Sequence, residues 1–282
     1  MSGTDGFITV NGVKLHYAEH GDQSSPPLLC LHGVTLAGGV WDSFAAQMCD
    51  RYHVLALTAR GHGDSDRADS YLGAVFVDDT AAFMAATGSA PATVCGHSMG
   101  GAIGIGLAAM HPEKVEKLIV VDAGPTPGGF RETLTEWLNS APDSFDTVEE
   151  AVEQWKLMPG VGMDKVDVNE LRRNVQLVME RGADGRLRSK TDPRLLQVLL
   201  GIGQPEGTPS DAAREQMMWA ACAAVKCPTL IVRGSRSTAL TRECGETMLA
   251  TIPNAQLVEV DAEHAIPQEN PSGFYEAVNA FI

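Results

Sequence analysis

The sequence lacks a basic cluster, a long apolar run and the features of a signal peptide. Its 21 Lys and Arg residues are outnumbered by 36 Asp and Glu residues, which gives a net charge of -15. A nucleic acid would meet net repulsion, so we expect no nucleic-acid partner. A membrane span needs about 18 or more consecutive apolar residues, and no such run occurs. We therefore expect no membrane contact and a cytoplasmic location.

The chain also has no CxxC pair among its six cysteines and no motif for a common cofactor. No segment resembles a dinucleotide-binding loop, a Walker motif or a cluster of zinc ligands, so we predict neither a metal nor a cofactor. We expect the cysteines to be reduced structural thiols. The composition, 44% hydrophobic and 20% charged, is that of a protein that buries a sizeable core.

Short apolar runs alternate with helical patterns along most of the chain. Asn11-Gly12 separates the first two runs and predicts an antiparallel hairpin. The later alternation predicts a mostly parallel, eight-stranded α/β sheet with helices on both faces. The predicted strands are 7–10, 15–18, 28–31, 54–57, 93–95, 118–121, 229–232 and 257–260.

The alternation stops between Val121 and Thr229, where helical patterns continue without a convincing strand. We predict an all-helical cap over residues 124–225, inserted between core parts 1–123 and 226–282. The apolar side chains of this segment either fill the core of the cap or line a substrate pocket. The tryptophan candidates for the pocket are Trp137, Trp155 and Trp219.

The strongest local signal is Gly96-His97-Ser98-Met99-Gly100-Gly101, which follows one predicted strand and precedes a helical pattern. A serine on such a sharp turn needs small neighbours, and the glycines supply them. This context predicts that Ser98 is a catalytic nucleophile. A second glycine turn, His32-Gly33-Val34, predicts that the backbone amides of Val34 and Met99 form an oxyanion hole. His32, Gly33 and His97 are further candidates for contact with the substrate.

A serine requires a base, and we predict His264 for this role. His264 follows the last predicted strand and precedes the final helical pattern. The other histidines lie in early strands, peripheral elements or turns. These arguments predict a nucleophile and a base that come together from segments far apart in the sequence.

These motifs resemble those of the α/β-hydrolase superfamily, over nearly the whole chain and in the same order. The resemblance rests on His32-Gly33, Arg60-Gly61-His62-Gly63-Asp64-Ser65, the Ser98 turn, Val121-Asp122 and His264. It implies a hydrolase with a cap and no cofactor. Epoxide hydrolases and haloalkane dehalogenases are disfavoured, because the resemblance implies an Asp nucleophile for them and this chain has Ser98.

The acid of the predicted triad departs from the pattern of most relatives. The resemblance places it in the turn after the strand 229–232, but Gly234-Ser235-Arg236-Ser237-Thr238 contains no carboxylate. A minority of relatives carry the acid one strand beyond the serine's strand. We therefore predict that Asp122 orients His264, since a base without an acid partner would work poorly. The alternative is that Asp122 only holds its turn.

Three function classes remain open. The first is a serine hydrolase that cleaves a small-molecule ester, lactone, amide or carbon–carbon bond next to a carbonyl. The second is a cofactor-free dioxygenase that uses a His–Asp dyad, and the third is a non-catalytic ligand sensor. The formation of a homodimer is left open. The candidates to hold a substrate carboxylate, each more typical of a solvated surface charge, are Arg131, Lys156, Arg172, Arg173, Arg233 and Arg236.

Overall fold

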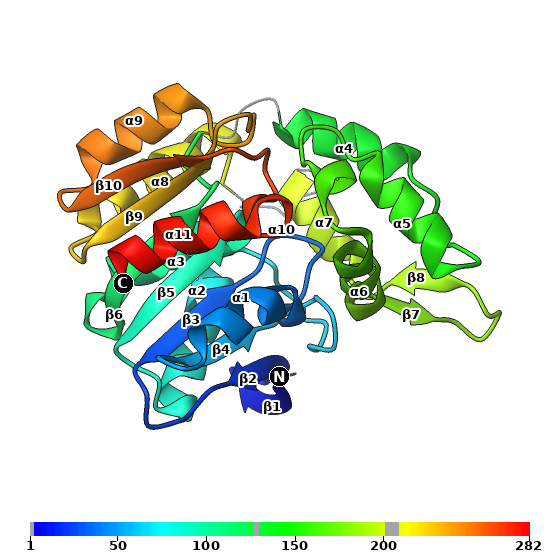
Figure 1. The fold of residues 1–282 in the computed structure, drawn as a ribbon, viewed down its shortest axis with the longest axis horizontal. Coiled ribbons are helices and arrows are strands. Elements are labelled where there is room, and N and C mark those ends of the chain that lie inside the picture. Colours follow the sequence, from blue (N-terminus) through cyan, green and yellow to red (C-terminus); the bar gives the residue numbers. More distant parts are fainter. Residues whose placement is uncertain (1–2, 127–129, 201–208) are drawn as a thin grey trace.

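A computed structural model describes residues 3–126, 130–200 and 209–282, without the side chains of residues 131, 199 and 200. The eight predicted strands are present and form one sheet in the order β1-β2-β4-β3-β5-β6-β9-β10 (Figure 1). β2 is antiparallel to β1 and β4, and the other neighbours are parallel. The strands are β1 (Thr4–Val10), β2 (Val13–His20), β3 (Pro27–Leu31), β4 (His53–Leu57), β5 (Ala92–His97), β6 (Val115–Val121), β9 (Thr229–Gly234) and β10 (Ala255–Val260).

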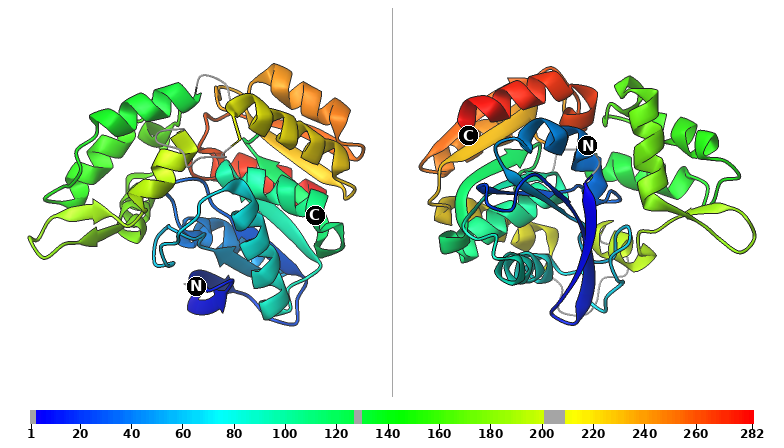
Figure 2. Two further views of the ribbon diagram at one scale, coloured as in Figure 1. Left: turned by 180° about the vertical axis from the view of Figure 1, so that it is seen from behind. Right: turned by 60° about the horizontal axis from the view of Figure 1, so that its bottom comes forward.

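Helices cover both faces of the sheet, as predicted. Side chains alternate along β3: Leu28 and Cys30 enter one core cluster, whereas Leu29 and Leu31 enter the other. The first cluster receives α1 (Asp42–Met48), α10 (Ile266–Glu269) and α11 (Pro271–Phe281). The second receives α2 (Gly73–Thr87), α3 (Met99–Met110), α8 (Asp211–Ala224) and α9 (Arg242–Thr251) on the opposite face (Figure 2).

The segment that follows β6 extends to one side of the sheet, and we call its elements from α4 to α7 the lid (Figure 1). The lid is not all-helical, which corrects the prediction. The expected helix 169–180 ends at Val178, and β7 (Met179–Arg181) pairs with β8 (Leu187–Ser189) around a Gly-Ala-Asp-Gly turn. The turn allows the chain to reverse, so the two strands satisfy each other's backbone groups. The lid helices are α4 (Phe130–Ser140), α5 (Val148–Lys156), α6 (Val168–Val178) and α7 (Pro193–Leu200).

Helix α8 lies inside the predicted cap range 124–225 but packs with the sheet. It contacts α3 and α9, and its Cys222 belongs to the core cluster on that face. We therefore describe α8 with the hydrolase core rather than with the lid. The division of the chain into core and cap at residues 124 and 225 stays a prediction.

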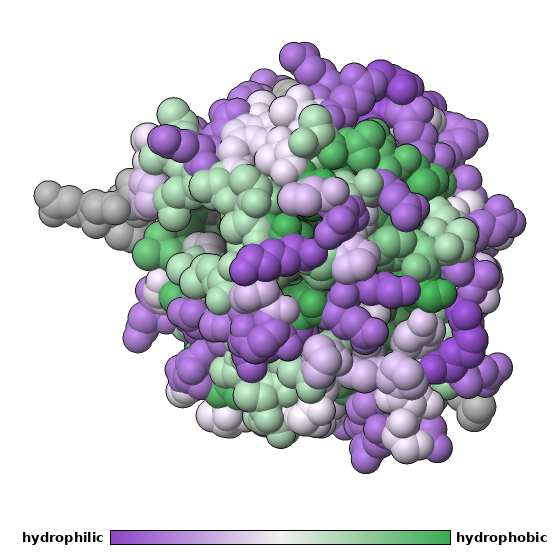
Figure 3. Space-filling model, turned by 90° about the vertical axis from the view of Figure 1, so that its left-hand side faces the viewer, coloured by the Kyte–Doolittle hydropathy of each residue, from purple (hydrophilic) through white to green (hydrophobic). Residues whose placement is uncertain are grey.

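The molecular surface turned away from the lid carries hydrophilic side chains interspersed with apolar ones (Figure 3). In the described part of the chain, no helix has the length and apolarity needed to cross a membrane.

The packing of Gly100 gives a test of the turn that holds Ser98. A Cβ at Gly100 would lie 2.2 Å from the carbonyl oxygen of Leu31, whereas a Cβ at Gly73 would meet no atom within 4 Å. We expect Gly100→Ala to lower the free energy of unfolding by about 1–3 kcal/mol. The control Gly73→Ala should leave it unchanged or raise it by up to about 1 kcal/mol, since alanine favours helices. Urea unfolding of both variants measures this, and equal stabilities would contradict the packing argument.

Candidate active site

Ser98 lies in the sharp turn between β5 and α3. Its φ of 53° and ψ of -116° are unusual for a residue with a side chain. Its N–H donates to the carbonyl of Val121 on the neighbouring strand at 2.9 Å. A Cβ at Gly96 would lie 2.2 Å from the carbonyl oxygen of Gly100, so the turn closes only with glycine there. This close packing presents the Ser98 side chain at the carboxyl edge of the sheet.

His264 lies between Ser98 and Asp122. The loop after β10 brings its Nε2 to 3.0 Å from the Ser98 Oγ and its Nδ1 to 2.7 Å from the Asp122 Oδ2. The segments that follow β5, β6 and β10 meet here. They do so because β5, β6, β9 and β10 are parallel neighbours, so their carboxyl ends share one edge of the sheet. The distances are those of hydrogen bonds, so the three side chains form one continuous chain of contacts.

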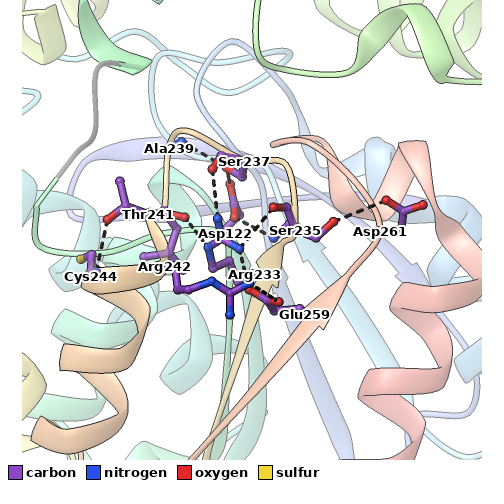
Figure 4. Close-up of polar contacts among 12 residues, drawn as sticks. Asp122, Arg233, Ser235, Ser237, Ala239, Thr241, Arg242, Cys244, Glu259 and Asp261 are labelled. Carbon is purple, nitrogen blue, oxygen red and sulfur yellow. Dashed lines mark hydrogen bonds and ion pairs between the residues drawn. The ribbon is translucent and has the colours of Figure 1, made fainter.

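Asp122 directly follows β6 and is almost completely buried, with 1% exposure. Its Oδ2 accepts the hydroxyl of Ser237 at 2.5 Å (Figure 4). Its Oδ1 accepts the N–H of Gly234 at 3.0 Å, and its Oδ2 also contacts His264. Gly234 ends β9, and Ser237 lies in the turn after it, where the resemblance places the acid. The sequence shows that this turn lacks a carboxylate, but nothing in its pattern predicts that the turn supplies donors to Asp122.

The glycine turn after β3 lies against Ser98. A Cβ at Gly33 would come within 3.3 Å of the Ser98 Cβ, so Val34, the next residue, is adjacent to the nucleophile candidate. Met99 is the first residue of α3, where backbone amides have no acceptor inside the helix. The positive end of the helix also favours negative charge at this point. These positions suit the predicted oxyanion hole.

His32 holds the glycine turn and is not among the residues that line the pocket at Ser98. Its Nδ1–H donates to the carbonyl of Gly33 at 2.7 Å, and its Nε2 accepts the N–H of Ala59 at 3.0 Å. Burial lowers the pKa of His32 to about 3, so the ring is neutral. The neutral ring joins two backbone segments and leaves no nitrogen for a substrate.

His97 lines the pocket and also supports the base. Its Nε2–H donates to the backbone carbonyl of His264 at 2.8 Å, and the two ring centroids are 4.7 Å apart. Burial lowers the pKa of His97 to about 3. The sequence predicts His97 only as a substrate contact, because nothing in the pattern shows that the residue before the serine reaches the loop of His264.

A pocket of about 400 Å³, part of it open to solvent, lies between the lid and Ser98. Of the predicted tryptophans, only Trp155 lines it. Trp137 packs in the core cluster that the lid shares, and Trp219 lies on α8 against the opposite face of the sheet. The lining residues are Gly33, Val34, Thr35, Leu36, His97, Ser98, Phe130, Leu134, Trp155, Met158, Val161, Met163 and His264.

The lid is attached to the loop that carries His264. The N–H of Ala265 donates to the carbonyl of Val161 at 2.8 Å, and the ammonium of Lys165 pairs with Glu263 and, at 3.7 Å, with Glu269. Arg236, in the turn after β9, also pairs with Glu269. These contacts close one wall of the pocket beside the base.

Comparison with known proteins identifies the family. Residues 26–271 match the model of the alpha/beta hydrolase fold. The chain belongs to this family. It is 30% identical to the 3-hydroxybutyrate-oligomer hydrolase of Cupriavidus necator, over 89% of this chain and 87% of that protein. It is 25% identical to the 2-(acetamidomethylene)succinate hydrolase of Mesorhizobium japonicum, over 98% and 94%.

Solved structures of other family members share the fold. A crystal structure of E-2-(acetamidomethylene)succinate hydrolase superposes with a TM-score of 0.82 at 22% identity, covering 99% of this chain and 98% of the other. The enol-lactonase from Burkholderia xenovorans gives 0.69 at 20% identity, covering 98% and 99%. These likenesses show the fold, and the family contains several kinds of hydrolase.

Proposed function

We propose that the chain is a serine hydrolase that works through an acyl-enzyme. In this proposal Ser98 is the nucleophile, His264 the general base and acid, and Asp122 the acid that orients His264. The observation that carries the proposal is the position of His264, whose two ring nitrogens contact Ser98 and Asp122 at 3.0 and 2.7 Å. A carboxylate on Nδ1 keeps the proton there, so that Nε2 is free to accept the serine proton.

The reaction follows from these contacts. His264 Nε2 takes the Ser98 hydroxyl proton as Oγ attacks the substrate carbonyl carbon, and the carbonyl oxygen becomes an oxyanion that the Val34 and Met99 amides stabilise. The tetrahedral intermediate collapses, and His264 gives the proton to the leaving group. A water molecule then attacks the acyl-enzyme while His264 takes its proton. Collapse of the second intermediate returns that proton to Ser98 and releases the acid.

The proposed bond is an ester, lactone, amide or carbon–carbon bond next to a carbonyl. All of these have a carbonyl carbon for Ser98 to attack, and the proposed oxyanion hole suits each of them. The names of the similar proteins include an oligomer hydrolase of 3-hydroxybutyrate and an enol-lactonase. An ester or lactone is therefore the first substrate type to assay.

The two other function classes receive less support. A cofactor-free dioxygenase needs the His–Asp dyad but no serine nucleophile, whereas here the Ser98 hydroxyl is within hydrogen-bond distance of the dyad. A ligand sensor that had lost its acid would not need a carboxylate on His264. Oxygen-dependent turnover that survives replacement of Ser98 would favour the dioxygenase.

Replacement of Ser98 tests the nucleophile. Ser98→Ala should lower kcat for a neutral 4-nitrophenyl ester on the order of 10³-fold or more, because no other group forms the acyl-enzyme. The variant should also lose covalent labelling by a small fluorophosphonate, measured by mass spectrometry of the intact protein. Its thermal unfolding should match that of the parent within a few degrees. Near-parental turnover would refute the nucleophile assignment.

Replacement of Asp122 tests the acid. Asp122→Asn keeps the volume but favours the wrong tautomer of His264, so kcat should fall by about 10²- to 10⁴-fold. Because the Ser237 Oγ contacts the same Asp122 oxygen as His264, adding Ser237→Asp to this variant should restore part of the activity. Steady-state kinetics of the parent, the single variant and the double variant measure both effects. Full activity of Asp122→Asn would show that His264 works without this carboxylate.

A further inference from the structure

The pocket above Ser98 offers an acyl group an apolar surface. Phe130, Leu134 and Trp155 line it from α4 and α5, and Met158, Val161 and Met163 line it from the segment that follows α5. From the core it receives Val34, Thr35 and Leu36, of which Thr35 is polar and uncharged. Among the described lining residues, no lysine, arginine, aspartate or glutamate is present.

The basic side chains that could hold a carboxylate are paired elsewhere. Lys156 pairs with Glu153, Arg172 with Glu149, and Arg173 with Glu170. In the core, Arg233 pairs with Glu259, and Arg236 pairs with Asp261 and Glu269. None of these five lines the pocket. The side chain of Arg131, the remaining candidate, lies outside the described residues.

We propose that the substrate class is a carbonyl compound whose acyl group is apolar and uncharged. This inference rests on the proposed function and deepens it. Burial of an apolar acyl group against the lid side chains would strengthen its binding about fourfold for each methylene group. A carboxylate in the same place would lose its hydration without a partner, which is costly in a pocket of this composition.

A pair of isosteric esters tests the proposal. The 4-methylpentanoyl and hemisuccinyl esters of 4-nitrophenol have acyl groups of similar shape, but one ends in two methyl groups and the other in a carboxylate. We expect kcat/KM to be about 10²-fold or more higher for the neutral ester, after subtraction of the rate with Ser98→Ala. From the acetyl to the butanoyl ester, kcat/KM should rise by about fourfold per methylene. A hemisuccinyl ester that is hydrolysed as well as the neutral one would overturn the proposal.

Variants locate the selectivity in the pocket. Met158→Arg puts a cation among the lining side chains. It should shift the ratio of kcat/KM between the 4-methylpentanoyl and hemisuccinyl esters at least tenfold towards the hemisuccinyl ester. The control Met158→Leu keeps the pocket neutral and should leave the ratio unchanged. Arg131→Gln should also leave the ratio unchanged. If the parent accepts the hemisuccinyl ester and Arg131→Gln loses it, a cation at Arg131 serves the pocket and the proposal is wrong.

Failure of the substrate class is distinguishable from failure of the hydrolase mechanism. Fluorophosphonate labelling of Ser98 reports the nucleophile without a carboxylate in the probe. Labelling together with a preference for the hemisuccinyl ester would overturn only the substrate class. If neither labelling nor turnover occurs, calorimetry with 4-methylpentanamide and succinamate decides the pocket's preference, and the proposal requires that only the neutral amide binds.

A second inference rests on a different observation, the hydroxyl of Ser237. This buried hydroxyl accepts the N–H of Ala239 at 3.1 Å, so its own proton points to the Asp122 Oδ2 (Figure 4). The turn is braced by the buried guanidinium of Arg233, which donates to the carbonyls of Leu240 at 2.9 Å and Ser237 at 3.3 Å. We infer that Ser237 is a positioning residue that holds the Asp122 carboxylate towards His264.

Three serine variants test this role. Ser237→Ala should lower kcat about tenfold and leave KM unchanged, because the acid loses a hydrogen bond to its charged form. Ser237→Thr keeps the hydroxyl and should restore most of kcat, whereas Ser235→Ala removes an exposed serine of the same turn and should have no effect. Unchanged kcat in Ser237→Ala would overturn the inference. If that variant unfolds, Ser237→Cys keeps the volume with a weaker donor, and parental kcat in Ser237→Cys would overturn it equally.

Discussion

The buried carboxylate of Asp122 is the constraint on which the site depends. An ionised carboxylate in the interior is costly unless hydrogen-bond donors surround it. The described partners of the Asp122 carboxylate are the Gly234 amide at the end of β9, the Ser237 hydroxyl in the turn after β9 and the His264 ring in the loop after β10. The need to satisfy this one group therefore fixes the carboxyl ends of three neighbouring strands relative to one another, and with them the base.

The same strand edge also holds two strained residues in place. Ser98 and Asp122 both have positive φ, at 53° and 49°, although neither is glycine. Such conformations persist only where the surroundings determine them. Here the N–H of Ser98 donates to Val121 and the N–H of Asp122 donates to Val232, so the hydrogen bonding of the sheet continues one residue past each strand end. The register of the neighbouring strands therefore fixes where the side chains of Ser98 and Asp122 lie.

The features that the sequence predicted well are those with a local pattern. The eight strands, the turn at Ser98 and the departure from the usual acid site could all be read from short segments, since periodicity and glycine spacing are local. The features it missed depend on tertiary contact: the β7–β8 pairing, the packing of α8 and Trp219 on the core, and the contact of Ser237 with Asp122. No spacing rule links residues 122 and 237, because their proximity results from the strand order.

The net charge of the chain and the lining of the pocket both bear on which substrates can bind. A net charge of -15 surrounds a pocket whose described lining has no lysine, arginine, aspartate or glutamate side chain. An anionic substrate would meet repulsion at long range and an apolar wall at short range, so both act against it. Lys165 of the lid pairs with Glu263, and Arg236 of the turn after β9 pairs with Asp261, so both are attached to the loop that carries His264. These two cations lie at the loop of the base and not in the pocket lining, so the pocket itself is left to select by shape and apolar contact.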